Sequence, residues 1–318
     1  WKTEKERLKP DHLQGDSNML AAASAVSRCG VQEVGKPGPG AMAVVALVGL
    51  LLFVYAASPA ARHQGAPADA TPAPLWSYSG EHGPARWGEL APAYGLCKHG
   101  RNQSPIAIRN SRFARLPALS FHYRSNALSI VNNGRTIRVD YAPGSYMRVD
   151  GKRYELKYFD FHSPSEHQFI GRAADMVVHL VHRGTAGEWV VVAVPVKSGR
   201  RLNSTLTRIW DRMPERPGEE FYGRQVGINA TFLLPSDRSY LTYMGSLTTP
   251  PCQEGVRWIL LRNAVELDAS YVSKFRRVIG ANARPVQPLN GRQVIAATRR
   301  CAEALYAHGS GLTIAVSG

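Results

Sequence analysis

The sequence predicts a mixed α+β fold, mainly β, in which one domain is built around a large antiparallel sheet. Three observations support this prediction. From Trp76 onward, short strand-like runs alternate with turn residues. Helical patterns are few, and the hydrophobic fraction of 44% and charged fraction of 20% are ordinary for a globular protein. At 318 residues the chain can form one large domain with a tail.

The strand prediction depends on five runs, which are residues 127–132, 136–140, 153–162, 176–182 and 188–196. Between the first two, Asn132-Asn133-Gly134 is typical of a tight hairpin turn. Helical patterns occur at residues 202–213 and 269–279, and a third is expected at the chain end, residues 292–307. Many strands with scattered helices favour a sheet-based fold over a helix bundle.

Residues 1–62 are predicted to be a leader rather than part of the fold. They contain the apolar run 41–57, which is shorter than the roughly 20 residues of a bilayer span. The small residues of AASPAA follow, as at a signal-peptidase site, so we expect a cleaved signal peptide and a periplasmic or secreted protein. A retained membrane anchor through 41–57 is the alternative. Residues 63–75, rich in Ala and Pro, are predicted to be a linker to a domain at 76–318.

The net charge of +15 belongs to the predicted domain, because the seven basic and five acidic residues of the leader almost cancel. A basic surface attracts nucleic acid, anionic lipid or an anionic polymer. The chain contains no dense Lys/Arg run and no nucleic-acid motif, so nucleic acid is not expected as a partner. A solvated basic surface is the simplest interpretation, with an anionic polymer as the alternative partner.

The chain contains four cysteines, and Cys29 lies in the leader. Cys97, Cys252 and Cys301 remain. In an exported protein, one disulfide and one free thiol is the simplest arrangement of three cysteines.

Two strand-like runs carry residues that can bind a metal. Alternate residues of a strand share a face, so Asp160 and His162 point the same way. His179 lies on the second run, and His182 falls on its opposite face. If the two strands pair, two imidazoles and one carboxylate converge, which is a ligand set for a catalytic metal with an open position. Spacing alone leaves a structural role open, because a buried histidine often only satisfies a core hydrogen bond. His167 and His182 are predicted to have such a role.

Longer motifs decide between these interpretations. Residues 243–258, YMGSLTTPPCQEGVRW, together with GRNQSPI at 100–106 and ARPVQPL at 283–289, closely resemble the α-carbonic anhydrase family. WSYSGEHGPARW at 76–87 resembles the family's opening, and the motifs occur in family order up to about Thr298. The resemblance implies a single domain around a large, mostly antiparallel twisted sheet with short peripheral helices.

The resemblance also implies a zinc site (Zn2+) at the floor of a cleft. The family's second and third histidine ligands correspond to His162 and His179, and the first corresponds to Asp160. Thr248 and Glu166 match the pair that orients the zinc-bound hydroxide. The carbon dioxide pocket, with Thr249 on its anion side, matches Val181, Val191, Leu247, Thr249 and Trp258. Other matching positions are Asn282 beside the second ligand, Tyr78 and Asn133 on the water chain, and the disulfide pair Cys97 and Cys252, which leaves Cys301 free.

Besides Asp160, this sequence departs from the family pattern at three positions. Tyr158 replaces the Gln that supports the first histidine ligand. Val177 replaces the carboxylate that buttresses the third, a kind of loss that typically weakens metal binding about 10–100-fold. Arg135 replaces the proton-shuttling histidine, and a guanidinium does not exchange protons near neutral pH.

These residues lead us to expect a zinc-dependent carbonic anhydrase, a lyase that converts carbon dioxide and bicarbonate with impaired activity. A carboxylate ligand lowers the net charge of the metal site, so bound water should be less acidic than beside three histidines. Two alternatives remain. One is a weakly metallated or inactive binding protein that uses its basic surface outside the cytoplasm. The other is a non-haem ferrous site, which Thr248 and Glu166 make less favoured because they serve hydroxide chemistry.

Overall fold

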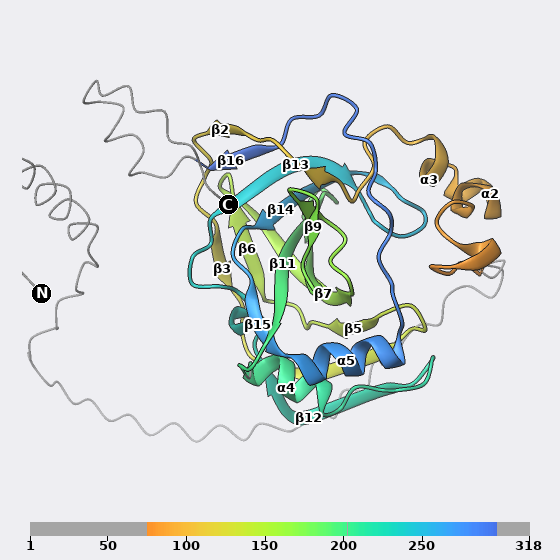
Figure 1. The fold of residues 1–318 in the computed structure, drawn as a ribbon. Coiled ribbons are helices and arrows are strands. Elements are labelled where there is room, and N and C mark those ends of the chain that lie inside the picture. The colour runs from red at the N-terminus through yellow and green to blue at the C-terminus, as the bar shows by residue number, and fades with distance from the viewer. Residues whose placement is uncertain (1–74, 202, 298–318) are drawn as a thin grey trace, which may run out of the picture. The chain divides into compact units, whose positions relative to one another are not determined.

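A sheet of 13 strands dominates residues 75–201 and 203–297, the part of the chain that the computed structural model describes (Figure 1). The main path of the sheet runs β12-β4-β5-β7-β10-β11-β14-β13-β16-β2, and β1-β8-β9 form a small second sheet. Most neighbouring strands are antiparallel, but β14 and β15 both pair with β11 in parallel. The predicted fold class, a mainly β protein with a large and mostly antiparallel sheet, is confirmed.

The strands are β1 (Ala107–Ile108), β2 (Arg112–Ala114), β3 (Ser120–His122), β4 (Asn126–Asn132), β5 (Ile137–Asp140), β6 (Tyr146–Val149), β7 (Lys152–His162), β8 (Gln168–Phe169), β9 (Arg172–Ala173), β10 (Met176–Gly184), β11 (Trp189–Gly199), β12 (Glu220–Ile228), β13 (Tyr240–Ser246), β14 (Glu254–Leu261), β15 (Val265–Asp268) and β16 (Ile295–Ala297). The helices are α2 (Trp87–Leu90), α3 (Leu96–His99), α4 (Ser204–Trp210) and α5 (Ala269–Val278), with 3₁₀ helices η1 (Gly80–His82), η2 (Pro92–Tyr94) and η3 (Ala230–Leu233).

Three central strands, β7, β10 and β11, separate two apolar clusters. Phe159, Phe161 and Val178 point into the larger cluster, which α4 and α5 cover. Val177 and Val181 lie on the opposite face of β10 from Val178 and point into the smaller cluster. β10 is buried along its first seven residues because it is covered on both faces, as its run of Val and Leu predicts. The face of the smaller cluster is also the face that carries Asp160 and His162.

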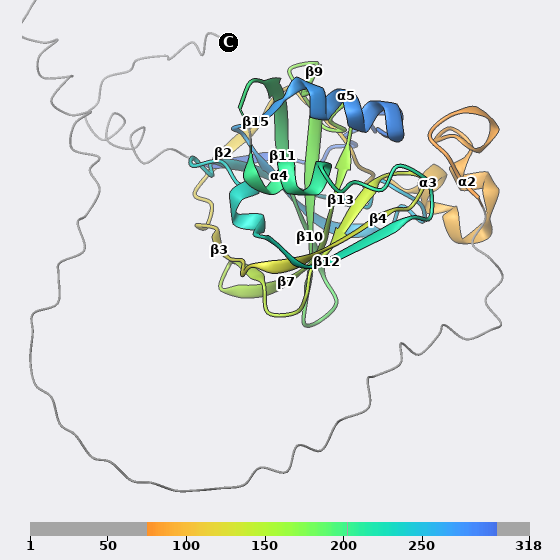
Figure 2. The same cartoon turned by 90° about the horizontal axis from the view of Figure 1, so that it is seen from below.

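The longer helices begin at side-chain caps. The side chain of Asn203 accepts hydrogen bonds from the N–H groups of Thr205 and Leu206 at the start of α4, and Asp268 caps α5 in the same way. α2 and α3 lie together at one side of the sheet, away from α4 and α5 (Figures 1 and 2). None of the helices among the described residues is long and apolar enough to cross a membrane.

The five predicted strands form, as β4, β5, β7, β10 and β11, and the hairpin turn lies between β4 and β5. The predicted helices at 202–213 and 269–279 correspond to α4 and α5. The predicted helix at 292–307 is wrong for its described part, because Ile295–Ala297 form β16 between β13 and β2. The leader 1–62, its apolar run 41–57 and Cys301 lie outside the described residues, as does the linker 63–75 except for Leu75, so the domain boundaries stay predictions.

Candidate metal centre and active site

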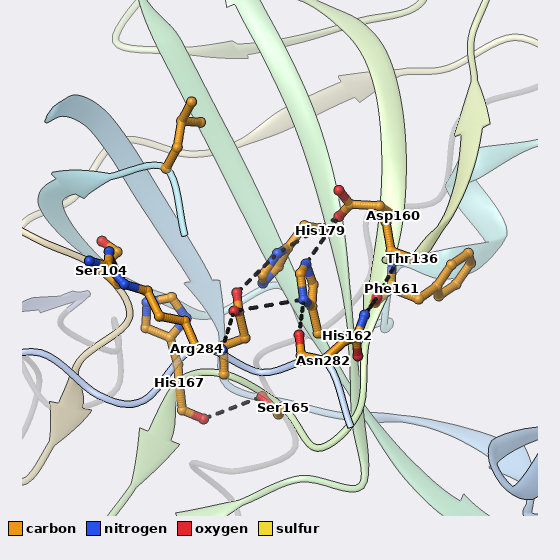
Figure 3. A network of polar contacts seen from close by, with 12 residues as sticks. Ser104, Thr136, Asp160, Phe161, His162, Ser165, His167, His179, Asn282 and Arg284 are labelled. Atoms are coloured by element: carbon orange, nitrogen blue, oxygen red, sulfur yellow. Dashed lines mark hydrogen bonds and ion pairs between the residues drawn. The ribbon is translucent and has the colours of Figure 1, made fainter. Parts of the chain in front are cut away.

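Asp160, His162 and His179 converge on one face of the sheet. His179 of β10 is directly opposite Asp160 of β7, and Asp160 and His162 are two residues apart on the same strand. Asp160 Oδ1 lies 3.6 Å from His162 Nε2 and 3.9 Å from His179 Nδ1. The ligand atoms of all three lie within 4.8 Å of one another (Figure 3). The pairing of the two strands therefore gathers the three donors that the sequence singled out.

The orientation of the His162 ring is fixed by Asn282. His162 Nδ1 lies 2.7 Å from the Asn282 carbonyl oxygen, which only accepts, so this nitrogen carries the proton and Nε2 faces Asp160. The Asn282 side chain is itself held by the N–H of Ser163 and the carbonyl of Phe161. Burial lowers the pKa of His162, but the carboxylates of Glu166 and Asp160 outweigh it and raise the pKa to about 9.

The His179 ring lacks a comparable partner. Its Nε2 is buried and makes no hydrogen bond to any residue that the structure describes. Val177, two residues earlier on the same strand face, has no polar atom to offer. Burial lowers the pKa of His179 well below its usual value, so the ring is neutral and one of its two nitrogens has a free lone pair.

The donor set fits a small divalent metal. Tetrahedral zinc with bonds of about 2.0–2.2 Å places neighbouring donor atoms about 3.3–3.6 Å apart. The separations of 3.6 and 3.9 Å around Asp160 Oδ1 are close to this range. Asp160 Oδ1 is buried and has no hydrogen-bond partner within 75–201 and 203–297, as expected of an atom reserved for a ligand. Two imidazole nitrogens and one carboxylate oxygen leave further positions of a zinc ion open.

A second buried carboxylate, Glu166, lies beside this centre. Its Oε1 accepts a hydrogen bond from the backbone N–H of Arg284 at 2.9 Å, and its Oε2 lies 3.8 Å from His179 Nδ1. Burial raises the pKa of Glu166, while His162, the Arg284 N–H and the Thr248 hydroxyl oppose the shift. Thr248 is thus near enough to act on the carboxylate, although Oε2 has no partner of full hydrogen-bond geometry among the described residues.

An apolar wall borders the donors. Val181, Val191 and Trp258 lie directly side by side on β10, β11 and β14, and all three are buried. Leu247 packs against the same cluster. The Trp258 ring lies 5.0 Å from the His179 ring, centroid to centroid, so the wall reaches the metal centre. Thr249, two residues after Leu247, is half-buried, and its carbonyl oxygen accepts a hydrogen bond from the N–H of Cys252.

Three polar residues predicted on the proton path lie around one cavity of about 590 Å³: Tyr78, Asn133 and Arg135. Tyr78 lies between this cavity and the metal centre, with its ring 6.5 Å from that of His162. Asn133 Oδ1 is used within the turn, where it accepts the N–H groups of Arg135 and Thr136. The Arg135 guanidinium lies over the Trp76 ring at 4.5 Å and donates from Nε to the Trp76 carbonyl.

Tyr158 lies elsewhere, two residues before Asp160 on the same strand. It packs at the edge of the smaller apolar cluster, and the guanidinium of Arg138 lies 5.3 Å from its ring centroid.

The predicted disulfide between Cys97 and Cys252 is confirmed, with a Cα–Cα distance of 5.0 Å. It joins α3 to the loop that follows Thr248 and closes a segment with a sequence separation of 155. A cross-link over so long a segment restricts the unfolded chain and fixes the loop beside the metal centre.

Two buried residues near the centre were not predicted as site residues. The Arg284 side chain donates to Gln103 Oε1 and to the carbonyl oxygens of Ser104 and Cys97. The His167 ring lies 2.7 Å from the Tyr243 hydroxyl, and burial lowers its pKa to about 3. Arg284 lies inside the ARPVQPL motif, so the motif marked the position, but its partners are about 180 residues away in sequence.

Comparison with known proteins agrees with this geometry. Residues 82–298 match the profile of the family described as eukaryotic-type carbonic anhydrase. A carbonic anhydrase from Nostoc sp. is 40% identical over 227 residues, which cover 70% of this chain and 86% of the relative. Dioscorin dioA3 from Dioscorea japonica is 31% identical over 222 residues, with coverages of 67% and 82%. The α-carbonic anhydrase of Thermovibrio ammonificans, solved with the inhibitor sulfanilamide, superposes with a TM-score of 0.68 at 46% identity, covering 70% of this chain and 99% of that one.

Proposed function

The chain belongs to the eukaryotic-type (α-class) carbonic anhydrase family, and we propose that it catalyses the reversible hydration of carbon dioxide at a zinc ion held by Asp160, His162 and His179. The observation that carries the proposal is the convergence of these three donors beside an apolar wall and a buried carboxylate. Asp160 Oδ1 is buried without a partner among the described residues, which supports a ligand at this point.

A bound zinc ion would lower the pKa of a water molecule toward neutrality and so supply the hydroxide nucleophile. Glu166 accepts a hydrogen bond from the Arg284 N–H, and it lies near enough to Thr248 to accept one from the Thr248 hydroxyl. The Thr248 oxygen is then free to accept a hydrogen bond from the hydroxide nucleophile, and this bond would orient the lone pair of the hydroxide oxygen. Carbon dioxide has no hydrogen-bond donor and binds against Val181 and Val191.

The product proton leaves on the polar side, past Tyr78. Burial raises the pKa of the Tyr78 hydroxyl well above its usual value, so it stays neutral and can only relay hydrogen bonds. The Arg135 guanidinium is held over the Trp76 ring, and a guanidinium does not exchange protons near neutral pH. Proton export therefore depends on solvent and buffer rather than on a side chain.

Activity is expected to be lower than with three histidine ligands. Asp160 brings a negative charge to the metal, which makes bound water less acidic. His179 Nε2 lacks an acceptor, which makes the ring a weaker ligand. An inactive protein that binds through its basic surface is the competing function.

A stopped-flow assay of carbon dioxide hydration distinguishes the two. The zinc-supplemented wild type should hydrate carbon dioxide faster than the buffer alone. Thr248→Val keeps the volume but removes the hydroxyl and should lose at least about tenfold in kcat. Ser239→Val, at a half-buried position before β13 and outside the site, is the control and should keep full activity. A wild type that holds zinc and gives no rate above buffer would exclude the proposal.

We also propose that the protein works in the periplasm or is secreted. The apolar run 41–57 followed by small residues supports a cleaved signal peptide, and the Cys97–Cys252 disulfide is compatible with an oxidising compartment. Nucleic acid is not an expected partner, and a membrane is one only through 41–57 if that segment is retained.

A further inference from the structure

A second cavity, of about 360 Å³, lies on the same sheet face as the metal centre, farther along β7 and β10. Its lining is Arg153, Glu155, Lys157, Arg183, Gly184 and Thr185. None of these residues belongs to the metal centre, the apolar wall or the proton path, so the proposed catalytic chemistry does not account for the cavity.

The register of the two strands creates the cavity. Arg183 of β10 is directly opposite Glu155 of β7, and Arg153 follows two residues away on the same face. The register shifts by one residue between Val181 and His182, so Lys157 has no counterpart on β10. Such a bulge re-aims a side chain, and here it adds a third cation to the lining.

The cations outnumber the carboxylates. Glu155 forms an ion pair with Lys157 and accepts the N–H of Gly144, so it is already occupied. Neither Arg153 nor Arg183 has a carboxylate within 4.0 Å in the part of the chain that the structure describes. The lining therefore carries three positive charges and one negative charge.

Aromatic rings hold the two guanidinium groups in place. Arg153 lies 3.9 Å from the ring centroid of Tyr146, and Arg183 lies 4.7 Å from that of Trp189. These contacts restrict the arginine side chains without consuming their hydrogen-bond donors. Both guanidinium groups are therefore pre-organised, and binding an anion would cost little side-chain entropy.

The surroundings add further positive charge. Arg148 of β6 is directly opposite Arg153, and like charges at directly opposed strand positions are destabilising. A further carboxylate, that of Glu188, lies beside Gly184, and its Oε1 is 3.9 Å from Lys152 Nζ. An anion bound beside Arg153 would offset part of this repulsion.

We propose that this cavity is a binding site for a phosphate group with nearly two negative charges, either free phosphate or a phosphate monoester. Two planar guanidinium groups match the oxygens of a tetrahedral oxyanion with paired hydrogen bonds, which an ammonium cannot do. A phosphate monoester carries nearly two negative charges at neutral pH, which neutralises the excess of two in the lining. The Thr185 hydroxyl at the wall adds a neutral donor. The phosphate comes either from solution or from a phosphorylated polymer outside the cytoplasm.

Titration of isotope-labelled protein, followed by amide NMR, tests the site. The probes are inorganic phosphate and glucose 6-phosphate, with glucose as the uncharged match and chloride to equalise ionic strength. Saturable shifts are expected at Gly184 and Thr185 with both phosphates and not with glucose or chloride. Arg153→Gln combined with Arg183→Gln should weaken binding by roughly tenfold or more. Arg224→Gln, which removes one exposed arginine from β12, should leave binding unchanged.

The double Lys variant, Arg153→Lys with Arg183→Lys, keeps the charge but loses the paired hydrogen bonds of the guanidinium groups. It should bind phosphate more weakly than the wild type. Equal binding by the double Gln variant, or shifts that spread over the surface without saturation, would overturn the proposal. Tighter binding of glucose 6-phosphate than of inorganic phosphate points to a polymer source, and the reverse points to free phosphate. Because no residue of the cavity lies in the metal centre, carbon dioxide hydration by the double Gln variant should equal that of the wild type. The phosphate site and the proposed activity can therefore be refuted independently.

Discussion

Restoring an acceptor for His179 should tighten zinc binding, and Val177→Glu is the substitution that does so. Val177 is 1% exposed and precedes His179 by two residues on the same strand face. His179 Nε2 is buried without a partner among the described residues, so a carboxylate from position 177 would meet an unsatisfied N–H. We expect the new carboxylate to form a charge-assisted hydrogen bond that orients the His179 ring and makes its other nitrogen more basic.

Two independent estimates give the size of the effect. A buried, unsatisfied donor costs about 1–3 kcal/mol. Loss of a partner behind a metal ligand typically costs about 10–100-fold in affinity, which is about 1.4–2.7 kcal/mol. We therefore expect the Kd for zinc to fall about tenfold to hundredfold at pH 7.5. In the metal-free protein the new carboxylate is buried, so some stability should be lost.

Competition with a chromophoric chelator measures this Kd, and circular dichroism checks that each variant is folded. Val177→Gln offers a neutral acceptor and should give a smaller gain. Val177→Leu offers none and should match the wild type. If the zinc affinity of Val177→Leu rises as much as that of Val177→Glu, or if neither the Glu nor the Gln variant binds zinc more tightly, the missing acceptor does not limit metal binding.

Three further predictions follow from the site and the core. Asp160→His should strengthen zinc binding and speed hydration at pH 7.5 by roughly 3- to 20-fold, since a neutral ligand moves the pKa of the bound water from the aqueous-ion range toward 7. Chelator competition measures the zinc affinity, and stopped-flow measures the hydration rate. If both are unchanged, the cleft is remodelled beyond one ligand. Arg135→His should raise turnover in about 1 mM buffer but not in concentrated buffer, because an imidazole can export the proton, and an equal effect at both buffer concentrations would contradict this. His182, stacked on Tyr123, has its pKa lowered to about 3 by burial. Its contribution to stability is complete above about pH 6.5, the unfolded value, and is lost as the pH falls toward 3, because only the unfolded chain takes up the proton. Between pH 6 and 4, urea unfolding of the wild type should therefore lose stability faster than His182→Gln by about 1.4 kcal/mol per pH unit, and parallel pH profiles would refute it.

Strand periodicity predicted that Asp160, His162 and His179 converge if their two strands pair, and the strands do pair in this way. Spacing alone left a structural role for the histidines open, and only the resemblance carried by the longer motifs favoured a zinc site. Reasoning from local periodicity failed at Ile295–Ala297, where pairing with β13 and β2 outweighs the local helical pattern. Contacts between distant segments were also beyond prediction. Arg284 donates to Gln103 and Cys97, and no local pattern reveals those partners.

The register of β7 and β10 had to be seen in the structure as well. Alternation alone placed His162 and His179 on matching faces, but it did not reveal the shift that leaves Lys157 unpaired. That shift, together with the rings under Arg153 and Arg183, builds the second cavity.

The zinc content and the rate of carbon dioxide hydration should be determined on the same purified sample, before chelation, after chelation and after zinc is returned. We expect close to one zinc per chain in the zinc-loaded protein, a hydration rate above buffer that disappears with the metal, and recovery of both when zinc is added. His162→Ala should hold far less zinc under the same conditions. A protein that takes up no zinc, or one that binds a single zinc and hydrates no carbon dioxide, would show that Asp160, His162 and His179 do not form a catalytic zinc centre.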